Sequence, residues 1–197
     1  MKIGIFGGSF NPVHCGHIYL AESVRDSLGL DRVIFVPSKI SPHKSNSEYV
    51  SEYHRLKMLE LAVEGEKGFE ISEYELRCER ISYSIYTAEH FRKKFPDDEL
   101  YLLIGSDMFL SFEKWYRFED IMKLVALAVV SRESQDYQPV EEKYREFSRL
   151  GKIIICPVPA FPASSTEIRK KIRENENYAC YLDKNVVQYI TSNNLYK

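Results

Sequence analysis

Hydrophobic residues form short uninterrupted runs that alternate along the chain with segments of helical spacing. Apolar runs without polar alternation are typical of strands buried on both faces, as in a parallel sheet. The predicted strands are residues 2–6, 33–36, 69–71, 75–77, 100–104, 125–130 and 153–155. The predicted helices are residues 18–28, 53–63, 82–95, 109–124 in broken form, 139–150, one that begins at 164–167, and a last one around 186–190.

This alternation predicts an α/β fold with a doubly wound, mostly parallel sheet, because parallel strands need crossover connections that are usually helical. Such a sheet binds its ligands in the crevice beyond the carboxyl ends of its strands. Four predicted strands are followed by turns, which begin near Gly7, Pro37, Gly105 and Ser131. We therefore expect these four turns to meet at the ligand-binding edge.

Length and composition narrow the class of protein. The 197 residues suit a single domain over 1–197, with a small helical portion from about residue 164, and a hydrophobic content of 44% supports a core. The net charge of -2 provides no basic field for nucleic acid, and no apolar run is long enough for a membrane span. The four scattered cysteines favour free thiols and a cytoplasmic location. Assembly into a homo-oligomer is left open.

The candidate chemistry is concentrated in the segment from Gly7 to His17, GGSFNPVHCGH, between the first predicted strand and the first predicted helix. A glycine-rich turn lets backbone N–H groups approach a phosphate, and the helix N-terminus adds partial positive charge. We therefore predict phosphate binding by this turn, in particular by Gly7, Gly8, Ser9 and Phe10.

Two histidines, His14 and His17, lie in the same turn. As metal ligands they lack acidic or cysteine partners at matching spacing, and as core residues they would be unusual in a glycine turn. Imidazole N–H groups can instead donate to phosphoryl oxygens where charge builds in a transition state. We interpret Cys15, between them, as a spacer. Its place beside a helix N-terminus could lower the pKa of the thiol, so sensitivity to oxidation is a hypothesis.

The turn resembles the HxGH signature of nucleotidylyltransferases with a Rossmann-like fold, and more closely that of the bacterial nicotinate-nucleotide adenylyltransferases. Other segments resemble motifs of the same family in the same order: Pro42-His43-Lys44, Gly105-Ser106-Asp107 with the downstream Trp115, Ser164 to Arg169, and the ending Tyr189-Ile190 with Leu195-Tyr196. The resemblance covers nearly the whole chain.

The resemblance implies transfer of AMP from ATP to the phosphate of nicotinate mononucleotide, with release of pyrophosphate, in NAD biosynthesis. The acceptor phosphate is already ionised, so no general base or protein nucleophile is needed. Catalysis then consists of positioning two anions and neutralising their charge. We assign this role to His14, His17, Lys44 and Arg169, with Mg²⁺ held by ATP oxygens and water.

Further ATP contacts are predicted at three places. Ser164 and Ser165 open a helix and can hold triphosphate oxygens, although a plain helix cap explains the same residues. Asp107 follows a strand and suits ribose hydroxyls or a metal-bound water, with a helix cap as the alternative. Arg132 ends a strand at the ligand edge, where it could reach phosphate or lie exposed on the surface.

The acceptor side is predicted from Trp115, the single tryptophan, and from the segment Ser82–Thr87. An indole can stack on a pyridine ring, although the neighbouring aromatic residues also suit a core position for Trp115. The resemblance favours stacking on nicotinate and places Ser84, Tyr86 and Thr87 near its carboxylate, together with Lys44. Tyr86 stands where the family usually has aspartate, which weakens discrimination against nicotinamide.

Two alternatives remain at this point. The first is an adenylyltransferase of the same fold that acts on nicotinamide mononucleotide or another phosphate acceptor. The second is a non-catalytic nucleotide-binding module.

Overall fold

The computed structural model describes residues 1–39, 49–131, 137–159 and 161–197, so the predictions for Lys44 and Arg132 lie outside the described residues. Its strands form one parallel six-stranded sheet in the order β3-β2-β1-β4-β5-β6. The strands are β1 (Lys2–Gly8), β2 (Arg32–Pro37), β3 (Phe69–Ile71), β4 (Glu99–Gly105), β5 (Ala126–Ser131) and β6 (Ile153–Pro157). The predicted doubly wound α/β fold is confirmed.

The strand predicted at residues 75–77 is wrong. The backbone N–H of Arg77 donates to the carbonyl of Glu73, and that of Cys78 donates to the carbonyl of Glu75. These local hydrogen bonds form a turn, so the same N–H groups are not used for hydrogen bonds to a neighbouring strand. A run of three residues is too short for its apolar pattern to distinguish the two conformations.

Helices follow the predicted spacing, and the predicted break in residues 109–124 is confirmed. They are α1 (Cys15–Leu28), α2 (Glu52–Val63), α3 (Ser84–Lys94), α4 (Ser106–Phe109), α5 (Phe118–Leu124), α6 (Tyr137–Phe147), α7 (Ser165–Arg173) and α8 (Lys184–Ser192), with short 3₁₀ turns at Phe112–Lys114 and Ala179–Tyr181. Gly29, at a φ of 60°, ends α1 in the left-handed conformation that glycine adopts at low cost. Asp183 caps α8 through its side chain.

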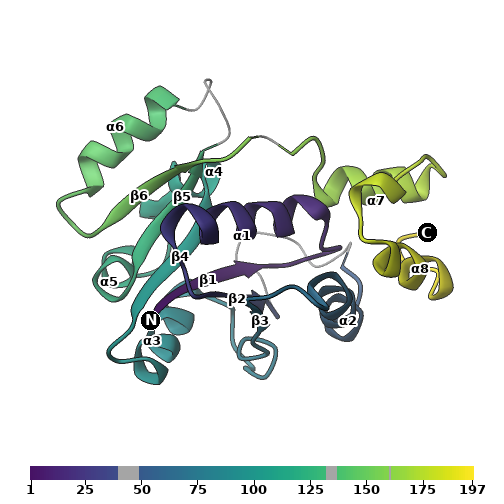
Figure 1. The fold of residues 1–197 in the computed structure, drawn as a ribbon, viewed down its shortest axis with the longest axis horizontal. Coiled ribbons are helices and arrows are strands. Elements are labelled where there is room, and N and C mark those ends of the chain that lie inside the picture. Colours follow the sequence, from purple (N-terminus) through teal and green to yellow (C-terminus); the bar gives the residue numbers. More distant parts are fainter. Residues whose placement is uncertain (40–48, 132–136, 160) are drawn as a thin grey trace.

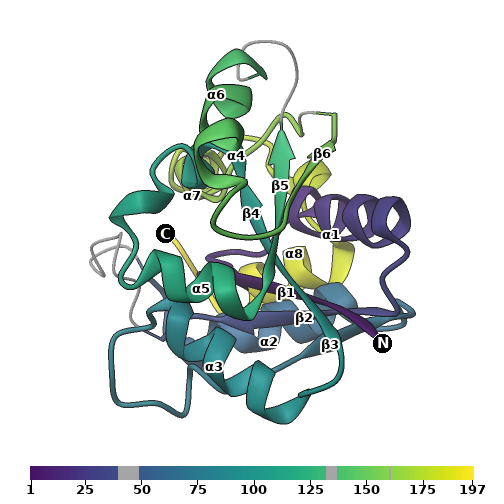
Figure 2. The same cartoon turned by 90° about the vertical axis from the view of Figure 1, so that its left-hand side faces the viewer.

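The sheet lies between two hydrophobic layers (Figures 1 and 2). Alternate residues of each strand point to opposite faces, so Ile3 and Ile5 of β1 join one core and Phe6 joins the other. Residues of α1, α2, α7 and α8 belong to the core that contains Phe6, while residues of α3, α4, α5 and α6 belong to the opposite core. Burial on both faces explains why the strands read as continuous apolar runs.

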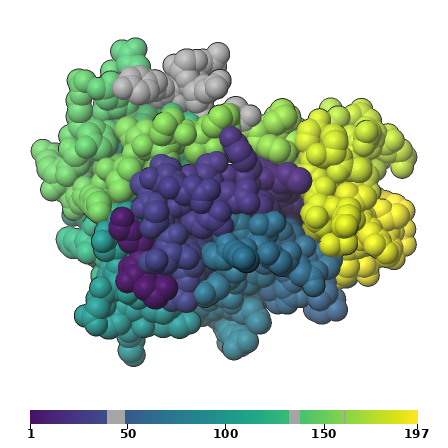
Figure 3. Space-filling view, viewed as in Figure 1, coloured from purple at the N-terminus to yellow at the C-terminus, as the bar shows by residue number. Residues whose placement is uncertain are grey.

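The carboxyl ends of neighbouring strands meet at one edge of the sheet. Gly8 is paired with Pro37, Gly105 with Val130, and Ser131 with Pro157. The helices α7 and α8 lie beyond the carboxyl end of β1 (Figure 1) and pack beside the start of α1 (Figure 3). The four expected turns therefore begin at a common edge.

Among the described residues, no helix combines the length and the apolar character that a membrane crossing needs. The four cysteines are free thiols, as predicted.

Candidate active site

Two cavities open at the carboxyl edge of the sheet and share one residue, Asp107. The first, here called the tryptophan cavity, has a volume of about 530 Å³, and its lining includes Gly7, Gly8, Ser9, Ser84, Asp107 and Trp115. The second, here called the histidine cavity, has a volume of about 270 Å³, and its lining includes His14, His17, Asp107, Ser164 and Ser165. The fold thus brings together most of the predicted site residues, in two adjoining compartments.

The two histidines lie at the start of α1, with His14 at the N-cap position. Their ring centroids are 3.8 Å apart, and the backbone N–H of His14 donates to Nδ1 of His17 at 3.2 Å. An Nδ1 that accepts a hydrogen bond places the proton of a neutral imidazole on Nε2. His17 therefore presents an N–H donor of the kind that a phosphoryl oxygen requires.

Gly16 makes this close arrangement sterically feasible. A Cβ at this position would lie 2.6 Å from Phe161 and 2.9 Å from Nδ1 of His14. The Phe161 ring stacks on the His14 ring with an interplanar angle of 9°. The glycine between the histidines is thus required by packing, which explains this part of the motif without any role in chemistry.

The start of α7 combines a cap with contacts to the phosphate turn. Ser164 accepts from the N–H of Glu167, and the Glu167 carboxylate accepts from the N–H of Ser164, which is the capping box the sequence predicts. Ser165 Oγ donates to the carbonyl of Pro12 at 2.9 Å. Both serines also line the histidine cavity, so the cap and a ligand contact are compatible.

Three predicted ATP residues are buried, namely His14, Phe10 and Arg169, and for the last two this limits contact with a ligand. The Phe10 ring is 1% exposed and packs on Phe6 and Phe35, so only its backbone remains for a ligand. Arg169 is 7% exposed and donates to the carbonyl of Asn11 at 2.9 Å, and it is not among the residues that line either cavity. Arg169 also donates to Oγ1 of Thr166 at 3.4 Å, so it connects the start of α7 with the phosphate turn.

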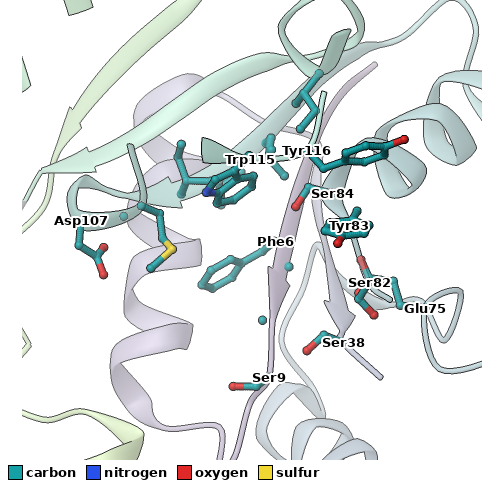
Figure 4. A pocket seen from close by; sticks show the side chains of 18 of the residues that line it. Phe6, Ser9, Ser38, Glu75, Ser82, Tyr83, Ser84, Asp107, Trp115 and Tyr116 are labelled. Carbon is teal, nitrogen blue, oxygen red and sulfur yellow. The ribbon is translucent and has the colours of Figure 1, made fainter. Parts of the chain in front are cut away.

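Trp115 lies where it packs against the core and also faces a cavity. Its indole packs on Phe112 at a centroid distance of 5.1 Å, and it also forms a wall of the tryptophan cavity opposite Phe6 (Figure 4). Asp107 lies at one end of this cavity, and Ser82 and Glu75 lie at the other end (Figure 4). The cavity therefore offers a flat aromatic surface between two polar ends.

Of the three residues of α3 predicted to lie near the pyridine carboxylate, one lines the tryptophan cavity and two do not. Ser84 lines the tryptophan cavity, whereas Tyr86 and Thr87 are not among the residues that line it. The Tyr86 ring lies under the guanidinium of Arg80 at 3.8 Å, and Thr87 is buried, with Oγ1 donating to Glu75. The side chains of Tyr86 and Thr87 therefore contact other parts of the protein and do not face this cavity.

Glu75 was missed by the sequence analysis because it falls in the segment wrongly predicted as a strand. Its carboxylate is 7% exposed, lines the tryptophan cavity and accepts from Thr87 at 2.5 Å. Burial raises the pKa of Glu75, and hydrogen bonds from Thr87 and Ser82 oppose this rise. A carboxyl group held in this way fixes the start of α3 against the cavity wall.

Replacement Glu75→Gln should make stability less dependent on pH. A raised pKa means that the folded state binds the proton more tightly, so stability is greatest below the ordinary value of 4.5 and falls as the pH rises through the folded value. Urea unfolding at pH 4.5 and pH 8 should therefore show the variant gaining stability relative to wild type at the higher pH. Glu73→Gln, at an exposed carboxylate of the same turn, is the control. A difference for Glu75→Gln that is flat or reversed with pH would contradict the assignment.

Arg55 was also missed. It is 1% exposed on α2, and its guanidinium donates to the carbonyl of Ser9 at 2.7 Å. No carboxylate among the described residues lies within ion-pair distance of it, and burial lowers its pKa. The signal was present in the sequence, because Arg55 precedes Leu59 by four residues and so lies on the buried stripe of the helix.

The helix N-terminus does not lower the pKa of the Cys15 thiol. Burial, followed by the nearby carboxylate of Asp183, raises the pKa of the Cys15 thiol. These effects outweigh the favourable position at the start of α1. Cys15 is therefore held as a neutral thiol.

The described residues contain no group of three or more His, Cys, Asp or Glu side chains that could hold a metal ion. Asp107, at the junction of the two cavities, supplies a carboxylate of the kind that a hard divalent cation accepts. A metal ion here would thus need most of its ligands from the substrate and from water.

Comparisons with known proteins agree with this geometry. A family model described as cytidylyltransferase-like matches residues 5–171. The chain is 39% identical to a probable nicotinate-nucleotide adenylyltransferase of Carboxydothermus hydrogenoformans, over 100% of this chain and 98% of that protein. It is 34% identical to nicotinate-nucleotide adenylyltransferase of Bacillus subtilis, again over 100% and 98%.

Similarity of fold extends to a solved structure. The nicotinic acid mononucleotide adenylyltransferase of Plasmodium falciparum, complexed with NaAD, superposes with a TM-score of 0.79. The alignment covers 99% of this chain and 97% of that one, at 19% identity.

Proposed function

The chain belongs to the nicotinate-nucleotide adenylyltransferases, and from this premise we propose how its two cavities divide the reaction between them. The protein transfers the AMP group of ATP to nicotinate mononucleotide, which gives nicotinate adenine dinucleotide and pyrophosphate in NAD biosynthesis. In our proposal the triphosphate of ATP occupies the histidine cavity, and the pyridine nucleotide occupies the tryptophan cavity.

The junction of the two cavities at Asp107 is the observation that carries this proposal. An acceptor phosphate that extends from one cavity meets the α-phosphate of ATP that lies in the other. Because both reactants are anions, holding them at this junction removes much of the entropic cost of their encounter and requires donors around the transferred group.

The start of α1 supplies these donors. We assign His14 and His17 to the oxygens of the α-phosphate, where negative charge develops, with the dipole of the 14-residue helix α1 adding to their effect. Gly7, Gly8 and Ser9 offer backbone groups, and Ser164 and Ser165 hold the outer phosphates. We also assign phosphate contacts to Lys44 and Arg132, and for these two residues the assignment rests on the sequence alone.

ATP is used in this family with a divalent metal ion, which we propose to be Mg²⁺. When bound, the ion neutralises charge on the phosphate oxygens and orients the pyrophosphate leaving group. Asp107 would hold it through a water molecule, in keeping with the preference of magnesium for a largely hydrated shell. Asp107 also remains available to the ribose hydroxyls.

The tryptophan cavity favours nicotinate over nicotinamide. Ser84, in the first turn of the 11-residue helix α3, lines this cavity, and the partial positive charge of a helix start favours a carboxylate. An uncharged amide gains much less from this charge. Glu75 on the same wall opposes the preference, so discrimination rests on the helix start.

We expect kcat/KM to be about fivefold higher with nicotinate mononucleotide than with nicotinamide mononucleotide, from a difference of about 1 kcal/mol in binding at the helix start. A pyrophosphate-release assay with both acceptors in parallel measures this ratio. Equal rates, or a preference for nicotinamide, would contradict the assignment of the cavity. ATP binding without pyrophosphate release on either acceptor would identify a non-catalytic module instead.

A further inference from the structure

The turn between the two cavities is held from behind by residues that are distant in sequence. Ser9, at one end of this turn, lines the tryptophan cavity, and His14, after its other end, lines the histidine cavity. Asn11 lies between them and is fully buried, with an exposed fraction of 0%. The position of Asn11 therefore affects both cavities.

Asn11 is the centre of a hydrogen-bond network. Its side-chain Oδ1 accepts from the hydroxyl of Tyr196 at 2.8 Å and from the backbone N–H of Val50 at 3.3 Å, and its carbonyl accepts from Arg169 at 2.9 Å. A buried amide oxygen that loses its donor bears the full cost of its desolvation. The turn is thus specified by these contacts and not by its own residues alone.

Tyr196 is the penultimate residue of the chain and reaches Asn11 across a sequence separation of 185 residues. Burial raises the pKa of Tyr196, so its hydroxyl remains a proton donor throughout the working range of pH. Its backbone has a φ of 65°, in the left-handed region that tyrosine rarely adopts. A strained conformation of this kind persists only where the surrounding contacts hold it.

We propose that Tyr196 is a positioning residue for the transfer reaction. Its hydroxyl fixes Asn11, and Asn11 fixes the turn that carries Ser9 toward one reactant and His14 toward the other. The inference rests on the proposed function, because it assumes that the turn binds the phosphates of ATP. It gives the end of the chain a role in the active site, although Tyr196 lines neither cavity.

The test compares Tyr196→Phe with Tyr189→Phe. The Tyr189 hydroxyl also makes a 2.8 Å contact between the end of the chain and α2, with Nδ1 of His54, but it does not touch the turn. Each variant loses one hydroxyl and one hydrogen bond, so the two should lose similar amounts of stability. We expect Tyr196→Phe to lower kcat/KM for ATP about tenfold, as the loss of one buried hydrogen bond allows, and Tyr189→Phe to stay within twofold of wild type.

The ATP dissociation constant, measured by calorimetry without acceptor, provides a readout that does not depend on turnover. It should rise severalfold for Tyr196→Phe, and the KM for the acceptor should rise as well, because the same turn carries Ser9 into the wall of the tryptophan cavity. Wild-type values of both ATP constants in Tyr196→Phe, or equal losses in the two variants, would overturn the proposal. A wild-type protein that binds ATP but releases no pyrophosphate would overturn the proposed function, and the dissociation constants would still decide the role of Tyr196.

Discussion

Replacement of His17 by alanine is expected to lower kcat at least a hundredfold, with a much smaller change in the KM for ATP. The backbone N–H of His14 donates to Nδ1 of His17, so the proton of the neutral ring lies on Nε2, from which our proposal has it donate to the phosphoryl oxygens. The charge on those oxygens grows only as the α-phosphate is attacked. Removal of one such donor costs about 10²- to 10³-fold in rate. Single-turnover measurement of pyrophosphate release with saturating ATP reports this step.

His90→Ala provides the matched control. His90 lies on α3, where its ring stacks on Tyr74, and it is not among the residues that line either cavity. Its replacement also removes an imidazole from a partly buried stack, so it reports the general cost of losing a ring. We expect turnover within twofold of wild type. A His17→Ala protein within tenfold of wild-type kcat would remove His17 from the catalytic role.

The fold was predictable because its strands are buried on both faces. Ile3 and Ile5 pack into one core while Phe6 packs into the other, so the run is apolar throughout and needs no alternation. The boundaries of two helices were also predictable, because Gly29 ends α1 and Ser164 caps the start of α7 through local contacts. The turn at 75–77 was not predictable, because three residues carry too little periodicity to separate a strand from a turn.

Some residues of the candidate site could be predicted from the sequence and others could not. His14 and His17 were predictable because one motif carries both of them on a single strand-to-helix turn. The roles of Glu75, Arg55 and Tyr196 were not predictable. Helical spacing puts Arg55 on a buried face, and the ending that resembles the family's includes Tyr196, but the contacts that give these residues their roles exist only in the fold. Arg55 reaches Ser9 over 46 residues of sequence, and Tyr196 reaches Asn11 over 185. A sequence motif identifies the candidate ligand-binding residues. The residues that hold the motif in position can be identified only once the packing of the folded chain is known.

Replacement of Trp115 by alanine is expected to raise the KM for the acceptor about 10- to 100-fold, since stacking of a heteroaromatic ring on an aromatic side chain contributes about 1–3 kcal/mol. The indole forms the wall of the tryptophan cavity opposite Phe6, so its loss opens one side of the space for the pyridine ring. The KM for ATP should stay within threefold, because Trp115 is not among the residues that line the histidine cavity. Initial rates with each substrate varied in turn separate the two constants.

Trp115→Phe distinguishes stacking from packing. Because Trp115 also packs on Phe112, the alanine variant loses stability as well as a stacking surface, and its free energy of unfolding must be measured beside its kinetics. A phenyl ring retains a flat surface on the cavity wall, so we expect Trp115→Phe to recover most of the acceptor affinity. If both substrate constants rose together in the alanine variant, or if the acceptor KM changed less than threefold, Trp115 would be a packing residue and the pyridine ring would lie elsewhere.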